Sequence, residues 1–289
     1  MKKCLVMLIA ACLVFSGVAQ ASEAPLKVTA VFYPLYVATI NVARDVPGLD
    51  IVCLAPPSAG CLHDYQMSTA DRRVLEDSDV VIINGAGLET FLDKLLPQLP
   101  AQIIVASEGI ELLTDEHGPN AHVWVSVPGM MAEVQNIADG LAKAAPDHAG
   151  KFQQNAASYI EELSVLEADM KATLAPYAGA PIVTFHEAFA YFAEDFDLDV
   201  VATVQHEHDM APSGRDLAIT ADAIREHDVK ALFAEPQYED TSVDILAKET
   251  GVPVFLLDPA VSGEVDPEDY GAYIRTMRQN MNTLVEALQ

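Results

Sequence analysis

Four side chains that could bind a metal ion lie far apart in the sequence: His63, His122, His186 and Asp258. They are separated by 59, 64 and 72 residues. Three neutral imidazoles and one carboxylate suit a divalent transition metal in tetrahedral or slightly expanded geometry, and zinc fits this donor set best. No HExxH or CxxC motif accompanies these residues, so the fold must bring them together.

The four candidates all lie at or beyond the carboxyl ends of expected strands. Residues 181–185 have strand composition, and helical periodicity begins directly after His186. Asp258 follows another strand pattern, whereas His63 and His122 lie in loops beyond strands. Ligands of open α/β sheets bind in the crevice outside the carboxyl ends of the strands. A single such histidine is more often a core residue, but four together favour a site between two facing sheets.

Strand and helix patterns alternate along most of the chain. Strands are expected at 27–32, 50–54, 79–85, 102–106, 181–185, 199–204, 229–234 and 254–257. A crossover helix is expected at 88–96 and a closing helix at 268–288. This alternation predicts an α/β fold with two doubly wound parallel-sheet lobes.

One segment departs from this alternation. Apolar residues recur every three or four positions between Lys151 and Ala175, and the segment contains no Gly or Pro. It predicts one long amphipathic helix, on the order of 40 Å, that acts as a rigid connector. The expected domains are therefore an N-terminal lobe at 22–146, a connecting helix at 147–176 and a C-terminal lobe at 177–289, with the metal cleft between the lobes.

The N-terminus has the pattern of a signal peptide. Two lysines precede an apolar run from Cys4 to Val18, and Ala-Gln-Ala precedes Ser22. We expect residues 1–21 to be cleaved after Ala21, leaving a protein exported to the periplasm. The run is too short for a membrane span. The segment ending at Cys12 faintly resembles a lipoprotein signal, but only five apolar residues precede it.

The chain is strongly acidic. Its 43 Asp and Glu against 16 Lys and Arg give a net charge of −27, and cleavage of the signal would remove two lysines and no acid. Such a surface repels nucleic acid and anionic lipid and attracts cations. An adaptation for solubility explains the charge equally well.

Two of the four cysteines, Cys53 and Cys61, remain after this cleavage. In an exported protein a pair eight residues apart is expected to form a disulfide. The alternative, a thiolate contribution to the metal site near His63, fits an oxidising compartment poorly.

Six short motifs together resemble one family, the zinc/manganese-type periplasmic solute-binding proteins of metal ABC transporters. The resemblance covers nearly all of the mature chain. Thr69 and Ala121 replace prolines that are usual in the family. The motifs are His63-Asp-Tyr-Gln-Met-Ser-Thr-Ala-Asp71, Asn84-Gly-Ala-Gly-Leu-Glu89, His122-Val-Trp124, Phe185-His-Glu-Ala-Phe-Ala-Tyr191, Glu235-Pro-Gln237 and Leu257-Asp-Pro259.

This resemblance implies that His63, His122, His186 and Asp258 bind the metal between the lobes, and that the partner is an inner-membrane ABC permease. A histidine at the third ligand position favours Zn²⁺, whereas the short Asp-Glu-His segment at 115–117 leaves Mn²⁺ open as the alternative. We expect a monomer, no enzymatic activity and no nucleic-acid partner.

Several other residues have competing interpretations. Glu235 could be a fifth ligand or could hydrogen-bond a ligand histidine, and we favour the second role. Glu187 could serve as the base of an exported zinc hydrolase, although Asp258 would then close the coordination sphere. His206 and His208 could form a weak second site, but a solvated polar loop explains them equally. Trp124 is expected to pack behind His122.

Overall fold

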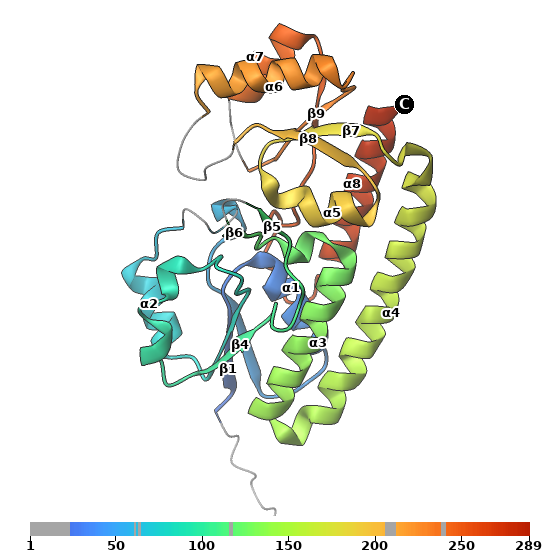
Figure 1. Ribbon diagram of the computed structural model, residues 1–289. Coiled ribbons are helices and arrows are strands. Elements are labelled where there is room, and N and C mark those ends of the chain that lie inside the picture. The colour runs from blue at the N-terminus through green and yellow to red at the C-terminus, as the bar shows by residue number, and fades with distance from the viewer. Residues whose placement is uncertain (1–23, 61, 63–64, 116–117, 206–211, 238–240) are drawn as a thin grey trace, which may run out of the picture.

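The computed structural model describes residues 24–60, 62, 65–115, 118–205, 212–237 and 241–289. The predicted signal peptide, His63, Cys61, His206 and His208 lie outside these residues. Two parallel four-stranded sheets lie one above the other, with helices around them (Figure 1). The predicted fold class is confirmed.

The first sheet has the strand order β2-β1-β3-β4. Its strands are β1 (Leu26–Ala30), β2 (Leu49–Cys53), β3 (Val80–Ile83) and β4 (Gln102–Val105). Every residue of β3 is buried, as expected for a strand covered on both faces of a parallel sheet. Strand order reverses between β1 and β3, so the crevice of this sheet opens at their carboxyl ends.

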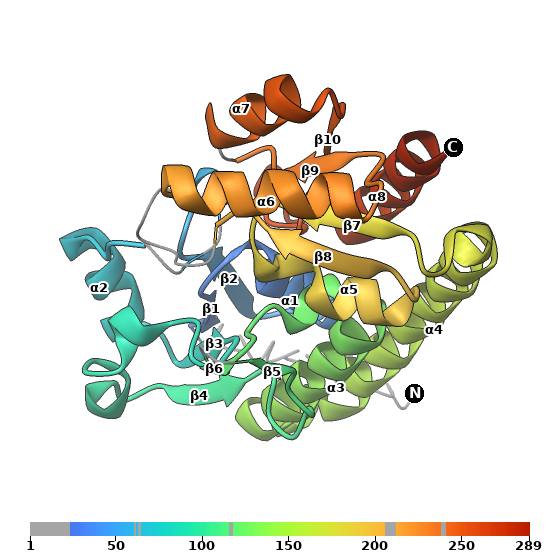
Figure 2. The same ribbon diagram turned by 45° about the horizontal axis from the view of Figure 1, so that its top comes forward.

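The second sheet repeats this topology, with the order β10-β9-β7-β8. Its strands are β7 (Pro181–Thr184), β8 (Asp199–Thr203), β9 (Leu232–Ala234) and β10 (Val254–Leu256). The reversal falls between β7 and β9, the strands that precede His186 and Glu235. Helices α6 (Gly214–Glu226) and α7 (Thr241–Thr250) cover the outer face, while α5 (Ala190–Asp195) lies on the side of the first sheet (Figures 1 and 2).

Three long helices run along one side of the molecule. They are α3 (Val127–Ala144), α4 (Ala149–Leu174) and α8 (Ala272–Leu288). Helix α4 extends past both sheets, and α8 lies beside it (Figure 1). All seven buried side chains of α4 are those of its predicted apolar stripe. The domain limits at 146/147 and 176/177 stay a prediction.

Helix α3 was absent from the sequence-based expectation, so α4 is half of an antiparallel hairpin and not an isolated connector. Its signals are Ser126, whose side chain accepts a hydrogen bond from the Gly129 amide at 3.0 Å, and an apolar stripe through Val134 and Ile137. The helices packed with the first sheet are α1 (Tyr33–Val42) and α2 (Thr69–Glu76), and α2 begins with a Ser68–Asp71 capping box.

The prediction of a crossover helix at 88–96 is wrong. This segment forms only short 3₁₀ turns, at Thr90–Leu92 and Leu96–Gln98. The buried Glu89 carboxylate accepts the Asn84 and Gly85 amides at 2.6 and 3.0 Å, which holds the chain in a turn. Three consecutive left-handed residues at 85–87 and Pro97 also oppose a continuous helix.

The two-stranded antiparallel ribbon of β5 (Thr114–Asp115) and β6 (Gly118–Pro119) precedes His122. Among the described residues, no helix is both long and apolar enough to cross a lipid bilayer.

Candidate metal site

His122 and His186, 64 residues apart, meet between the two sheets. Their Nε2 atoms lie 3.2 Å apart and their rings meet edge to face, with centroids 4.9 Å apart. The two residues are 0% and 2% exposed. Two imidazoles in this environment are shielded from bulk water, so the groups that surround them decide where their protons lie.

His186 is fixed from the second sheet. It follows β7, and Glu235 follows the neighbouring β9, so both lie where the strand order reverses. The Glu235 Oε1 atom accepts a hydrogen bond from His186 Nδ1, and Glu235 is 1% exposed. The hydrogen bond that we favoured for Glu235 from the sequence is therefore present, and it can orient the His186 ring.

His122 is fixed by Asn120. Asn120 Oδ1 lies 2.9 Å from both the backbone nitrogen and Nδ1 of His122, and its Nδ2 donates to the Glu187 carbonyl at 2.9 Å. Asn84, which follows β3, donates to the Ala121 carbonyl at 2.9 Å. The His122 segment is thus attached both to the first sheet and to the loop after His186.

Trp124 and Tyr273 attach the same segment to the C-terminal part of the chain. The Trp124 indole donates to the Pro259 carbonyl at 2.7 Å, and the Tyr273 hydroxyl on α8 donates to the Trp124 carbonyl at 2.8 Å. The ring centroids of Trp124 and His122 are 5.2 Å apart, so Trp124 packs behind the histidine as expected.

Asp258 is held at its backbone by α8. The Asn280 side chain accepts the Asp258 amide at 3.0 Å and donates to the Asp258 carbonyl at 2.7 Å. Asp258 Oδ1 accepts the Val261 amide at 3.2 Å. Burial raises the pKa of the Asp258 carboxyl, while hydrogen bonds from Ser262 and from backbone amides act in the opposite direction.

The histidine pair can bind a cation. Glu235, when ionised, can only accept a hydrogen bond, so the proton of neutral His186 lies on Nδ1. The side-chain nitrogen of Asn120 donates to Glu187, so its oxygen faces His122 Nδ1. The proton of neutral His122 therefore also lies on Nδ1. Each Nε2 atom then carries a lone pair, and a cation close to both nitrogens would stabilise the pair.

The structure brings two of the four predicted ligands into contact and connects the third to them. His122 meets His186, and Asp258 is joined to the His122 segment through the hydrogen bond between Trp124 and the Pro259 carbonyl. Within the described residues, no group of three or more His, Cys, Asp or Glu side chains is placed to hold a metal ion. His63, the remaining predicted ligand, lies outside them.

Cys53 is a free thiol, and its Sγ donates to the Ala55 carbonyl at 3.2 Å. Burial raises the pKa of this thiol to about 12. A free thiol at Cys53 does not support the expected disulfide with Cys61, which is therefore not confirmed.

Sequence reasoning missed Asn120, Tyr273 and Asn280, which position the ligand segments. Nothing in their local sequence distinguishes these three residues from other polar residues, and only their burial, at 8%, 2% and 1% exposure, sets them apart.

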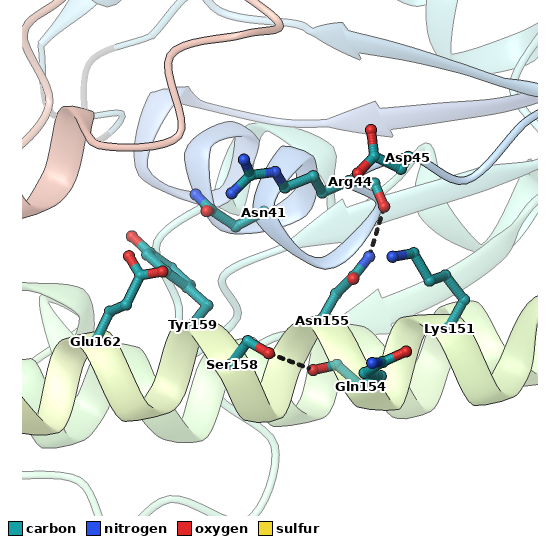
Figure 3. A pocket seen from close by; sticks show the side chains of 9 residues that line it. All are labelled: Asn41, Arg44, Asp45, Lys151, Gln154, Asn155, Ser158, Tyr159 and Glu162. Atoms are coloured by element: carbon teal, nitrogen blue, oxygen red, sulfur yellow. Dashed lines mark hydrogen bonds between the residues drawn. The ribbon is translucent and has the colours of Figure 1, made fainter.

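A separate polar hollow of about 240 Å³ opens between α1 and α4 (Figure 3). Arg44, Lys151, Asp45 and Glu162 contribute mixed charges to its lining, and none of the four predicted ligands belongs to it. The hollow is therefore not part of the histidine site.

The twin parallel sheets, the long helix beside them and the buried histidine pair between them define an α/β solute-binding protein class. The family model described as zinc-uptake complex component A, periplasmic, matches residues 28–287, so the chain belongs to this family. The family expected from the sequence motifs is confirmed.

Individual relatives agree with this assignment. The chain is 28% identical to the high-affinity zinc uptake system protein ZnuA of Bacillus subtilis, covering 94% of this chain and 90% of that protein. It is also 28% identical to the zinc-binding protein AdcA of Streptococcus pyogenes, over 91% of this chain but only 56% of AdcA.

Two solved structures share the fold. FpvC of Pseudomonas aeruginosa with Ni²⁺ has a TM-score of 0.82 and 29% identity, covering 92% of this chain and 97% of FpvC. Zn(II)-bound AdcA of Streptococcus pneumoniae has a TM-score of 0.77 and 29% identity, covering 91% of this chain and 58% of AdcA.

Proposed function

We propose that this protein captures Zn²⁺ in the periplasm and delivers it to an inner-membrane ABC permease. The observation that carries the proposal is the 3.2 Å separation of the His122 and His186 Nε2 atoms. Two imidazole nitrogens bound to one tetrahedral zinc at about 2.0–2.1 Å lie roughly 3.3 Å apart. The pair therefore already has the spacing that one zinc ion requires.

We assign Asp258 and His63 as the other two ligands. In support, Asp258 belongs to the segment that accepts the Trp124 hydrogen bond, and it retains a half-buried carboxyl group. His63 is supported by its motif and by the position of Tyr65, whose hydroxyl donates to Asp71 Oδ2 at 3.0 Å at the start of α2. Coordination by His63, His122, His186 and Asp258 would be closed, with no position left for substrate.

Zinc is favoured over manganese by the chemistry of the donors, because imidazole is a softer ligand than carboxylate. The relatives named as zinc uptake or zinc-binding proteins support the same metal. FpvC, however, has been solved with both Ni²⁺ and Mn²⁺, which supports manganese as the alternative cargo. Iron is the further alternative that the family resemblance implies.

Delivery to a permease follows from the family, whose description is that of a component of an uptake complex. Export to the periplasm rests on the signal-like sequence at 1–21, and the acidic mature chain would attract cations there. Protons compete with the metal for imidazole, so affinity should fall as the medium becomes acidic.

We propose that the protein is not an enzyme. A zinc hydrolase would keep one coordination position open for water. It would also need Glu187 or a similar carboxylate as base, and no HExxH motif accompanies the histidines in the sequence. Hydrolytic turnover by the zinc-loaded protein would revive this alternative.

Native mass spectrometry tests the proposal. The metal-free mature protein is offered equimolar zinc and manganese, beside a His186→Ala variant and the matched variant His227→Ala, in which the histidine is exposed at the end of α6. We expect one zinc on the parent and on His227→Ala, and loss or strong weakening in His186→Ala. Preferential manganese would contradict the metal assignment, and no bound metal would contradict the function.

A further inference from the structure

A close contact joins the loop that follows β2 to the segment that follows β9. Gly60 has a φ of +67°, and a Cβ atom there would lie 2.9 Å from Cγ of Gln237. The Gly60 backbone therefore packs directly on the Gln237 side chain. A larger residue would combine an unfavourable backbone conformation with displacement of Gln237.

Gln237 continues this contact to the histidine pair. Its Nε2 donates to Glu235 Oε2, while Glu235 Oε1 accepts from His186 Nδ1. Each oxygen of the Glu235 carboxylate thus has a different donor. Since a carboxylate only accepts, the amide nitrogen of Gln237 must face it. Gln237 Oε1 then points away and has no hydrogen-bond partner among the described residues.

We propose that Gln237 is a positioning residue that couples packing of the Gly60 loop to the orientation of His186. This inference rests on the proposed zinc function. When the loop is packed, Gly60 keeps the Gln237 side chain in its hydrogen bond to Glu235. Glu235 then accepts the hydrogen bond from His186 Nδ1, and this orients the ring so that Nε2 faces His122. With the loop displaced, Gln237 loses its packing surface and Glu235 loses a charge-assisted hydrogen bond.

The consequence is a defined route for metal release. Movement of the Gly60 backbone would loosen His186 through Gln237 and Glu235. A permease that displaces this loop would therefore weaken zinc binding at His186, without breaking the hydrogen bonds that hold the His122 and Asp258 segments.

The test measures zinc dissociation from the full mature chain by stopped-flow mixing with an excess of chromogenic chelator. Gln237→Met keeps the length and apolar packing of the side chain but removes the amide that donates to Glu235. Gly60→Ala keeps this amide but displaces the Gln237 side chain. We expect each to speed dissociation roughly tenfold, in line with loss of one hydrogen bond to a charged group. Gln98→Met, an exposed glutamine, is the control and should leave the rate unchanged.

The double variant distinguishes coupling from two independent defects. If both changes act through the same hydrogen bond, Gly60→Ala combined with Gln237→Met should be no faster than the faster single variant. An unchanged rate in Gln237→Met, or multiplicative effects in the double variant, would overturn the proposal. Gln237→Met alone decides the question if Gly60→Ala does not fold. A parent protein that binds no zinc contradicts the proposed function itself, and this inference with it.

Discussion

The two histidines of the site are supported by different kinds of contact. The His122 segment is fastened at its backbone, through hydrogen bonds from Asn84 and Tyr273 to the Ala121 and Trp124 carbonyls. His186 is held at its side chain by a relay of polar groups, from Glu235 to Gln237 and on to the Gly60 loop. Hydrogen bonds to the backbone within a packed core resist movement of the His122 segment. The contacts that hold His186 end on a loop, so movement of that loop can break them.

Helix α8 explains why the first support is rigid. Tyr273 and Asn280 lie two turns apart on this helix, and they hold the His122 and Asp258 segments respectively. The same helix packs on α4 and α1, which belong to the core of the first sheet. We infer that His122 and Asp258 form the fixed side of the site and His186 the adjustable side.

The largest effect is expected from Asn280→Leu, which removes the support of Asp258. The partly buried amide and carbonyl of Asp258 would each lose a partner, so the free energy of unfolding should fall by about 2–4 kcal/mol and zinc affinity at least tenfold. Chemical denaturation and competition titration measure these changes.

Asn136→Leu is the matched control for that change. Asn136 also bridges two carbonyls, those of Ala106 and Glu108, but contacts neither ligand segment. It should lose stability while keeping its zinc affinity. Equal zinc affinities in the two variants would contradict the role assigned to Asn280.

The fixed side should also respond to Glu133, a fully buried residue on α3. Its two carboxyl oxygens have no hydrogen-bond partner among the described residues, and burial raises its pKa to about 8. Its charge would act on Tyr273 and Tyr191, whose hydroxyls donate to the Trp124 and Asn120 carbonyls. Ionisation of Glu133 should therefore disturb the His122 segment.

The sign of this effect follows from proton linkage. Between about pH 4.5 and pH 8 the unfolded chain releases the Glu133 proton while the folded protein keeps it, so its contribution to stability falls as pH rises. Glu133→Gln should be more stable than the parent by about 2–4 kcal/mol at pH 8 and by almost nothing at pH 4. Urea titrations across this range would show it, and the exposed Glu161→Gln should give no such trend.

On the adjustable side, Glu235→Gln should weaken zinc binding about 10- to 100-fold, the usual cost of changing a group that orients a metal ligand. The folded structure should change little, because the amide has nearly the shape of the carboxylate. Competition titration measures the affinity, and circular dichroism checks the fold. Unchanged affinity would remove Glu235 from the account of the site.

The smallest effect is expected at Cys53. Its thiol donates to the Ala55 carbonyl, and burial raises its pKa to about 12, which disfavours a metal-binding thiolate at this position. Cys53→Ser should change zinc affinity by less than about twofold. A larger loss would restore the thiolate alternative.

Strands and their order of appearance were predictable because buried parallel strands give continuous apolar runs, as in β3. Helix α4 was predictable because its apolar stripe is long and uninterrupted. The segment at 88–96 was not, because the hydrogen bonds from the Asn84 and Gly85 amides to Glu89 override its helical pattern. Local periodicity does not report such tertiary contacts.

The site was predictable to a similar extent. His122 and His186 could be selected by residue type and by position relative to strands, and Glu235 by its motif. Their supports could not, since Asn120 and Asn280 act through backbone groups whose position only the folded chain defines. The Gly60–Gln237 contact joins residues 177 positions apart and leaves no local signal in the sequence.

The central claim is that one zinc ion lies between the two Nε2 atoms. Crystals of the zinc-loaded protein, measured at the zinc absorption edge, would test it directly. The account predicts one strong anomalous peak about 2.0–2.1 Å from Nε2 of both His122 and His186, with His63 and Asp258 completing the coordination. A peak elsewhere, or a histidine pair without metal at full zinc loading, would contradict it.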